Sequence, residues 1–288
     1  MSTNSVYQIV TDKIISLLEK DIVPWQRPWV NGVQPTSLIS GKGYRGINPV
    51  MLNAQAIASG YESNYWITYK QAQARGGQVR KGEKGSVVVF WKWFVSEDED
   101  TGKKKTIPML RYYTVFNVEQ CDGIDYPKPE AVTEFEAVEK AEEIIRKYSD
   151  KPKIMHDNGG ARYSPSSDYV ALPKPEYFHS NHGYYATLFH ELVHSTGHTS
   201  RCNRFGPEHN HSFASEDYSK EELVAELGAA MLCGLSGINN TIENSAAYIK
   251  SWLEALRNDV KMVVMAAAKA QKASDYIQGI KFETEAEE

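Results

Sequence analysis

The stretch "YYATLFHELVHSTGH", residues 184–198, contains two histidines four positions apart, with a glutamate directly after the first. On an α-helix, positions i and i+4 share one face, so the imidazoles of His190 and His194 can hold one metal ion. Glu191 is then placed to act as general base on an activated water. The rest of this predicted helix, about 182–196, is mostly apolar, where a buried His or Glu without a partner would be unfavourable. The pattern therefore predicts a catalytic metal site rather than a surface helix with solvated histidines.

A site of this type needs a third protein ligand and one open coordination position. Three candidates follow along the chain: His198, Glu222 and Glu226. A glycine is expected to end the helix before His198. Glu222 lies three residues after Ser219 and fits a helix-capping box, whereas Glu226 falls among apolar residues in the middle of the next predicted helix, about 220–235. We therefore favour Glu226 as the ligand and keep Glu222 as the alternative. In some sites of this type the ligand glutamate is followed four residues later by a supporting acid, and that arrangement would make Glu222 the ligand and Glu226 the supporting acid.

The length and composition indicate a two-domain protein. The chain has 288 residues, more than one compact domain usually contains, and 41% of them are hydrophobic. No apolar run approaches the length of a membrane span, the N-terminus shows no signal peptide, and three cysteines form no CxxC pair. We expect a cytoplasmic protein with no membrane partner.

The order of predicted elements indicates an α+β fold. The N-terminal half is predicted to contain helices over 5–20, 46–59 and 68–75, and strands over 85–95 and 110–118 around a charged loop. A polar, proline-bearing segment over 126–134 is the predicted linker. The C-terminal half is predicted to be mostly helical, with helices over 135–148, 182–196, 220–235, 243–259 and 262–274 and short strands over 152–156 and 168–172. The predicted domains are therefore residues 1–128 and 129–288.

The charge and aromatic content of the N-terminal half favour a polyanionic partner. Residues 1–128 hold 16 Lys and Arg against 12 Asp and Glu, whereas residues 129–288 hold 16 against 25. Proteins that bind single-stranded nucleic acid combine basic groups with aromatic rings on which bases stack. The alternative is that most of these aromatic side chains belong to the core. The candidates for DNA binding are Trp25, Arg27, Trp29, Tyr44, Arg45, Trp66, Lys70, Arg80, Lys81 and Lys84.

Both halves resemble one known family. The segments "YYATLFHELVHSTGH" and "EELVAELGAAML" are similar to the zincin-like C-terminal domain of ArdC-type antirestriction proteins, which mobile genetic elements carry. The segments "VPWQRPW" (23–29), "YRGIN" (44–48), "YWITYKQAQARGGQVRKGEKGSVVVFW" (65–91) and "YYTVFNVEQ" (112–120) resemble the N-terminal domain of that family. The resemblance implies a domain that binds single-stranded DNA, followed by a metallopeptidase domain with one divalent ion. We expect zinc there, with manganese as the alternative.

The resemblance also implies a function in conjugation. A protein of this kind protects plasmid DNA that enters a new host as a single strand from the restriction system. The expected chemistry is peptide hydrolysis with Glu191 as base, and a tyrosine or histidine from 207–218 stabilising the oxyanion. The substrate would be an unidentified protein or peptide, such as a host restriction component. Two alternatives stay open: a DNA-binding protein whose metal site is structural or vestigial, and an accessory factor of a primase.

Overall fold

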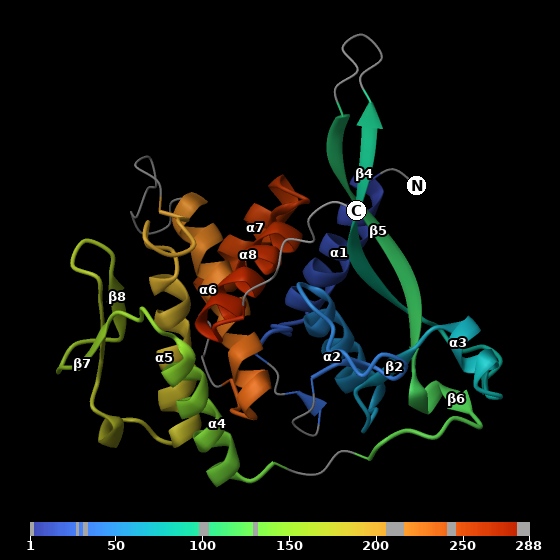
Figure 1. Ribbon diagram of the computed structural model, residues 1–288, viewed down its shortest axis with the longest axis horizontal. Helices are drawn as coiled ribbons and strands as arrows, with labels where there is room; N and C mark the ends of the chain where they lie inside the picture. Colours follow the sequence, from blue (N-terminus) through green and yellow to red (C-terminus); the bar gives the residue numbers. More distant parts are fainter. Residues whose placement is uncertain are drawn as a thin grey trace.

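The structure of the chain is a computed structural model (Figure 1). It describes residues 3–26, 29–30, 34–97, 104–128, 132–205, 216–240 and 246–280. The predicted α+β class is confirmed, since helices and three separate small sheets alternate along the chain. Within these ranges, no helix combines the length and apolar character that crossing a membrane would require.

The N-terminal half is built around a four-stranded sheet with the strand order β1-β2-β5-β4. A short two-stranded sheet, β3-β6, lies beside it. Predicted helices and long strands are found within a few residues of their expected ends, but the short strands β1, β2, β3 and β6 were not predicted. The elements are α1 (Thr3–Leu18), β1 (Thr36–Ser37), α2 (Asn48–Ser59), β2 (Tyr65–Ile67), α3 (Tyr69–Ala74), β3 (Gln78–Val79), β4 (Ser86–Glu97), β5 (Lys104–Asn117) and β6 (Cys121–Asp122).

Strands β4 and β5 form a long antiparallel ribbon that projects beyond the helices (Figure 1). Cross-strand partners share a face, so Trp91 and Leu110 lie on one side of the ribbon. That side packs on α1, where the ring of Tyr7 lies 6.3 Å from the ring of Trp91. The free edge of β4 is capped, because the side chain of Asn48 exchanges two hydrogen bonds with the backbone of Val89. One face and part of one edge of the ribbon are therefore covered.

The C-terminal half consists of packed helices and a three-stranded sheet with the order β7-β9-β8. Helices α5 and α6 lie side by side, and α8 packs against α6. Strand β8 forms an edge of the sheet next to α5. The elements are α4 (Glu134–Lys147), β7 (Lys153–His156), β8 (Arg162–Ser164), β9 (Tyr169–Leu172), α5 (Asn181–Ser195), α6 (Glu216–Ser236), α7 (Ala246–Asn258) and α8 (Met262–Ile277).

One hydrophobic core runs through both halves. The indole of Trp25 lies 5.3 Å from that of Trp252 on α7, and the hydroxyl of Thr11 on α1 donates a hydrogen bond to the carbonyl of Val260. A fragment ending at residue 128 would expose this apolar surface of α1 to water, at a cost in free energy. The domain boundary near residue 128 stays a prediction.

Candidate metal centre

Helix α5 presents the two histidines on one side. Its start is fixed by Ser180, whose hydroxyl accepts a hydrogen bond from the backbone N–H of Gly183. The apolar residues predicted to be buried are buried, including Leu188, Phe189, Leu192 and Val193. The helix is thereby anchored at its N-terminus and along its apolar face. This anchoring sets the direction in which the remaining face points.

Helix α6 supplies three glutamates to the same region. It begins at Glu216, earlier than predicted, so Ser219 lies inside the helix and the predicted capping box with Glu222 is wrong. Position 222 is consequently a mid-helix position with no capping role. Glu221, Glu222 and Glu226 all have little exposed side-chain surface, at 10%, 13% and 5%. Three nearly buried carboxylates on one helix require cationic partners.

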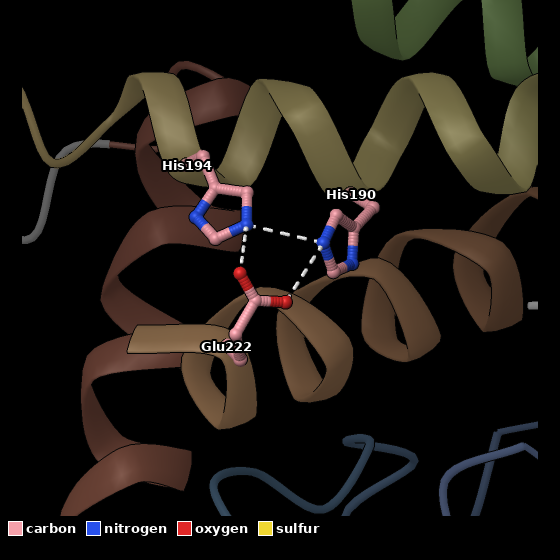
Figure 2. A group of neighbouring side chains, drawn as sticks. All are labelled: His190, His194 and Glu222. Carbon is pink, nitrogen blue, oxygen red and sulfur yellow. Dashed lines mark hydrogen bonds and ion pairs between the residues drawn. The ribbon is translucent and has the colours of Figure 1, made fainter. Parts of the chain in front are cut away.

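His190 and His194 of α5 and Glu222 of α6 point toward one another (Figure 2). The two histidine Nε2 atoms are 3.1 Å apart. The carboxylate oxygens of Glu222 lie 3.6 Å from the Nε2 atom of His190 and 3.5 Å from that of His194. These three side chains are the group that the geometry brings together; Glu226, which the sequence favoured, lies outside it, and we propose Glu222 as the third ligand.

The geometry of this group fits a divalent metal ion. A tetrahedral ion with bonds of about 2.1 Å separates its ligand atoms by about 3.4 Å. The two Nε2 atoms are 3.1 Å apart, and each oxygen of Glu222 lies near that value from one histidine, Oε1 at 3.5 Å from Nε2 of His194 and Oε2 at 3.6 Å from Nε2 of His190. Two imidazoles and one carboxylate are also ligands that zinc and manganese accept. The group could therefore hold one such ion and leave a further coordination position open.

Two further carboxylates stand behind the histidines. The Oε1 atom of Glu226 lies 3.9 Å from the Nδ1 atom of His190, a buried nitrogen with no hydrogen-bond partner among the described residues. The Oε1 atom of Glu221 lies 3.4 Å from the Nδ1 atom of His194. Such carboxylates orient a metal-binding imidazole and increase its basicity. Glu226 thus has a supporting position, and Glu221 has a role that the sequence did not indicate.

Arg204 holds Glu221 in place. Its guanidinium donates one hydrogen bond to each carboxylate oxygen of Glu221, at 2.9 and 2.6 Å. It also donates to the hydroxyl of Thr196 and to the backbone carbonyl of Val193, at the end of α5. Because a bidentate pair restrains both partners, Arg204 links the end of α5 to the carboxylate that faces His194.

The charges in this region are strongly coupled. Burial alone would raise the pKa of Glu221, but Arg204 and His194 lower it to about 2. Burial also opposes ionisation of Glu222, and the two histidines lower its pKa nevertheless. For His194, burial alone would lower the pKa, yet Glu221 and Glu222 raise it to about 10. At neutral pH Glu221 and Glu222 are ionised, and a proton on His194 supplies part of the positive charge that they require.

The group faces a cavity of about 870 Å³. Glu191, 7% exposed, lines this cavity together with both histidines and Glu222. Arg162 and Tyr163 of β8 lie on its wall, and so does Tyr218 of α6, at the end of the predicted 207–218 segment. A substrate could therefore approach the group from solvent, between the edge of the small sheet and α6.

The aromatic residues predicted to bind DNA are mostly packed inside the protein. Trp25 is 1% exposed and Trp66 is 0% exposed, so neither can stack on a base, and both predictions are wrong for this conformation. Trp29 packs so closely on α6 that a Cβ atom at Gly234 would overlap its indole. Tyr44 is half-buried against the cluster that contains Trp66. Periodicity could not separate these residues from exposed ones, because they pack against distant elements.

The basic candidates are at the surface where the structure describes them. Lys70, Lys81 and Lys84 are exposed. Arg80 is exposed and donates a hydrogen bond to Glu83 at 2.9 Å, and Arg45 forms an ion pair with Asp275 of α8. Arg27 lies outside the described residues. The positive side chains remain candidates for phosphate contacts.

The fold and the metal-binding group together define a zincin-like protein, and the comparisons agree. A family profile described as zincin-like metallopeptidase matches residues 139–269. A second, described as the N-terminal domain of the anti-restriction factor ArdC, matches residues 4–116. The crystal structure of the antirestriction ArdC protein from plasmid R388 is 42% identical in its metal-free form, with a TM-score of 0.79; the match covers 94% of this chain and 96% of that one. The chain belongs to the ArdC family of antirestriction proteins.

Other relatives add two observations. The Mn(II)-bound structure of the same R388 protein is 41% identical, with a TM-score of 0.77 and the same coverage. DNA primase TraC of Escherichia coli is 39% identical over 292 residues, which cover 94% of this chain but 20% of TraC. An uncharacterized protein of Sinorhizobium fredii is 37% identical, with 94% of this chain and 91% of that protein covered. The chain therefore spans a fifth of the length of that primase and nearly all of the Sinorhizobium protein.

Proposed function

We propose that this protein binds single-stranded DNA, that it protects plasmid DNA entering a host as a single strand from restriction, and that it hydrolyses a peptide bond at the α5–α6 site. The family relationship supports the antirestriction role. The observation that carries the enzymatic part is the placement of His190, His194 and Glu222 at the wall of an open cavity of about 870 Å³. A purely structural metal site is usually closed by four protein ligands, whereas a catalytic one keeps a position open to solvent.

The chain's own residues have distinct roles in this chemistry. A divalent ion held by His190, His194 and Glu222 would supply the Lewis acid that activates water and polarises a carbonyl. Glu191 accepts the proton of the attacking water and returns it to the amine that leaves when the C–N bond breaks. Burial raises the pKa of Tyr218, so its hydroxyl keeps a proton that it can donate to the developing oxyanion.

The wall of the cavity suits an extended peptide. Strand β8 is an outer strand of its sheet, so one of its edges can pair with the backbone of a bound segment. Arg162 and Tyr163 of that strand line the cavity. We propose a protein or peptide substrate, with a component of the host restriction system as the candidate. The proposed ion is zinc or manganese, and manganese is the ion in the R388 relative.

Conjugation into restricting recipients tests this proposal. Unmodified plasmid is transferred in the presence of the wild-type protein, Glu191→Gln, or Glu176→Gln, which removes an exposed carboxylate outside the cavity. Wild type and Glu176→Gln should raise the yield of transconjugants equally, and Glu191→Gln should not. Metal content must stay unchanged in Glu191→Gln, so that loss of protection reports chemistry. Equal protection by Glu191→Gln would favour a structural metal site, and no protection by wild type would reject the antirestriction role.

The similarity to TraC favours a second candidate, an accessory role in priming the transferred strand. It rests on the alignment of 94% of this chain with those primases. A primer-synthesis assay with a purified plasmid primase, with and without this protein, separates the two. Stimulation of primer synthesis that persists in Glu191→Gln, without protection from restriction, would support the accessory role.

A further inference from the structure

A stack of two aromatic rings lies on the face of the β4–β5 ribbon that is turned away from α1. The rings of Phe90 and Tyr113 are parallel within 5° and their centroids are 4.5 Å apart. Tyr113 is 59% exposed, although Val88, its partner on the neighbouring strand, is buried. Large exposed aromatic surface on a folded protein commonly marks a site of interaction.

The register of the ribbon places the two rings on one face, next to the part of that face where Val88 and Val115 are buried in a cluster with Leu52 and Ala56 of α2. Phe90 pairs with Arg111, and Val88 pairs with Tyr113, so these side chains project from the same face. The intervening residues, Trp91 among them, project from the other face and pack on α1. Since α1 covers one face, the rings of Phe90 and Tyr113 lie on the face turned away from it.

The charge around the stack favours a polyanion. Arg111 and Lys92 are exposed on the same face as the two rings. The stretches "SVVVFWK" (86–92) and "MLRYYTVFN" (109–117) contain no acidic residue. Bases stack on aromatic faces without sequence preference, while arginine and lysine neutralise the phosphates between them.

We infer that Phe90, Tyr113, Arg111 and Lys92 form a stacking platform for single-stranded DNA. A nucleobase stacks on the exposed ring of Tyr113, and Arg111 and Lys92 contact the adjacent phosphates. The platform replaces the buried Trp25 and Trp66 as the aromatic part of the DNA site. This inference rests on the proposed binding of single-stranded DNA by the protein.

A groove beside the platform offers a path for the strand toward the C-terminal half. It has a volume of about 350 Å³, and Phe90 borders both the groove and the platform. Arg45, Trp91 and Gln271 line the groove. Because Gln271 belongs to α8, a strand that follows this groove would contact both halves of the protein. Arg45 and Gln271 both hydrogen-bond to Asp275, so Phe90 and Trp91 are the groove residues that suit a base.

The experiment measures the binding of a fluorescein-labelled oligothymidylate to the full-length protein by anisotropy. Tyr113→Ala should weaken binding by about fivefold or more, because one stacked base is lost. Tyr113→Trp should bind as wild type does, since it keeps a stacking ring. Arg111→Gln should reduce the slope of log K against log salt by about 0.7. Phe135→Ala is the matched control, because Phe135 is 77% exposed on α4 in the other half, and it should change affinity less than twofold, as surface changes usually do.

A second measurement uses only the wild-type protein, so its result does not depend on whether a variant folds. A strand containing 5-bromodeoxyuridine is photocrosslinked to the wild-type protein, and the modified peptides are mapped by mass spectrometry. Crosslinks within 86–92 and 109–117 are expected. If wild type binds the strand but Tyr113→Ala binds equally well and the crosslinks lie elsewhere, the platform is wrong while DNA binding stands. If wild type binds no single strand, the DNA-binding part of the proposed function fails, and the platform fails with it.

Discussion

The α5–α6 site and the β4–β5 ribbon arrange charged side chains in opposite ways. In the site, Glu221, Glu222 and His194 are nearly buried and lie within 3.5 Å of one another or of a cation. On the ribbon, Arg111 and Lys92 are exposed beside aromatic rings. Buried charges interact strongly and depend on one another, whereas exposed charges are screened by water and salt. Single substitutions should therefore have large, non-additive effects in the site and small, nearly additive effects on the ribbon.

The largest effect is expected from removing one histidine. His190→Ala deletes one of the two imidazoles that face Glu222 and leaves that carboxylate with less positive charge. We expect bound zinc or manganese, measured by mass spectrometry of the purified protein, to fall below detection. The gain in melting temperature that saturating metal gives to wild type should vanish as well. Undiminished metal content in this variant would remove the site assignment.

The two glutamates of α6 should differ in the size of their effects. Glu222→Gln removes the carboxylate that lies near both Nε2 atoms, while Glu226→Gln alters a group 3.9 Å from the far nitrogen of His190. Metal affinity, measured by competition with a chelator, should drop far more than 100-fold for Glu222→Gln. Loss of a supporting carboxylate usually costs about 10–100-fold, which we expect for Glu226→Gln. The reverse order would exchange the two roles.

The pH dependence should separate the metal-free and metal-bound forms. An ion must displace the proton on His194, whose pKa is raised to about 10, so metal affinity should increase as pH rises from about 6 to about 8. The increase is about tenfold per pH unit for each proton released. Without metal, the folding stability shows the opposite trend. The pKa of His194 in the folded protein exceeds its unfolded value of about 6.5, so the stabilisation by the charged imidazole is fully present below that pH and is lost as pH rises toward 10. Titration calorimetry in two buffers measures the proton release, and a pH-independent affinity would contradict this description.

Arg204→Gln should affect the site through Glu221. The variant loses the bidentate contact that fixes the carboxylate facing His194. Metal affinity should fall by about tenfold, as for other changes behind metal-binding histidines. Arg204→Lys keeps the positive charge but cannot form the bidentate pair, so its metal affinity should lie between those of wild type and Arg204→Gln. Wild-type metal affinity in both variants would show that Glu221 is held without Arg204.

The smallest effect is expected at an isolated surface lysine. Lys84 is exposed in the N-terminal half and was predicted to contact DNA. Lys84→Gln should weaken binding of a single strand by about twofold and reduce the salt slope by about 0.7, if it contacts one phosphate. A salt slope equal to that of wild type would remove Lys84 from the DNA site.

The metal-binding helix could be predicted from sequence because its determinants are local. The spacing of His190 and His194 sets their common face, and Ser180 caps the helix as expected. The choice between Glu222 and Glu226 could not be made, because both share a face of α6 and the outcome depends on how α6 packs against α5. The earlier start of α6 also removed the structural explanation that had disfavoured Glu222.

The N-terminal half shows the limit of composition as evidence. Trp25 and Trp66 stand among basic residues in the sequence, yet Trp25 packs on Trp252, more than 200 residues away, and Trp66 is buried beside α2. Tyr113 is exposed, whereas Val88 and Val115 on the same face of the ribbon are buried in the cluster that contains Trp66. Alternation along a strand predicts which residues share a face, but the covering of that face depends on tertiary packing.

Anomalous X-ray diffraction from crystals soaked separately with zinc and manganese tests the central claim most directly. The account predicts one strong anomalous peak at about 2.0–2.2 Å from the Nε2 atoms of His190 and His194 and a carboxylate oxygen of Glu222, with a further position open toward the cavity. Glu226 should stay out of contact with the ion. A peak bonded to Glu226 in place of Glu222, an ion closed off by a fourth protein ligand, or no peak between the two histidines would contradict it.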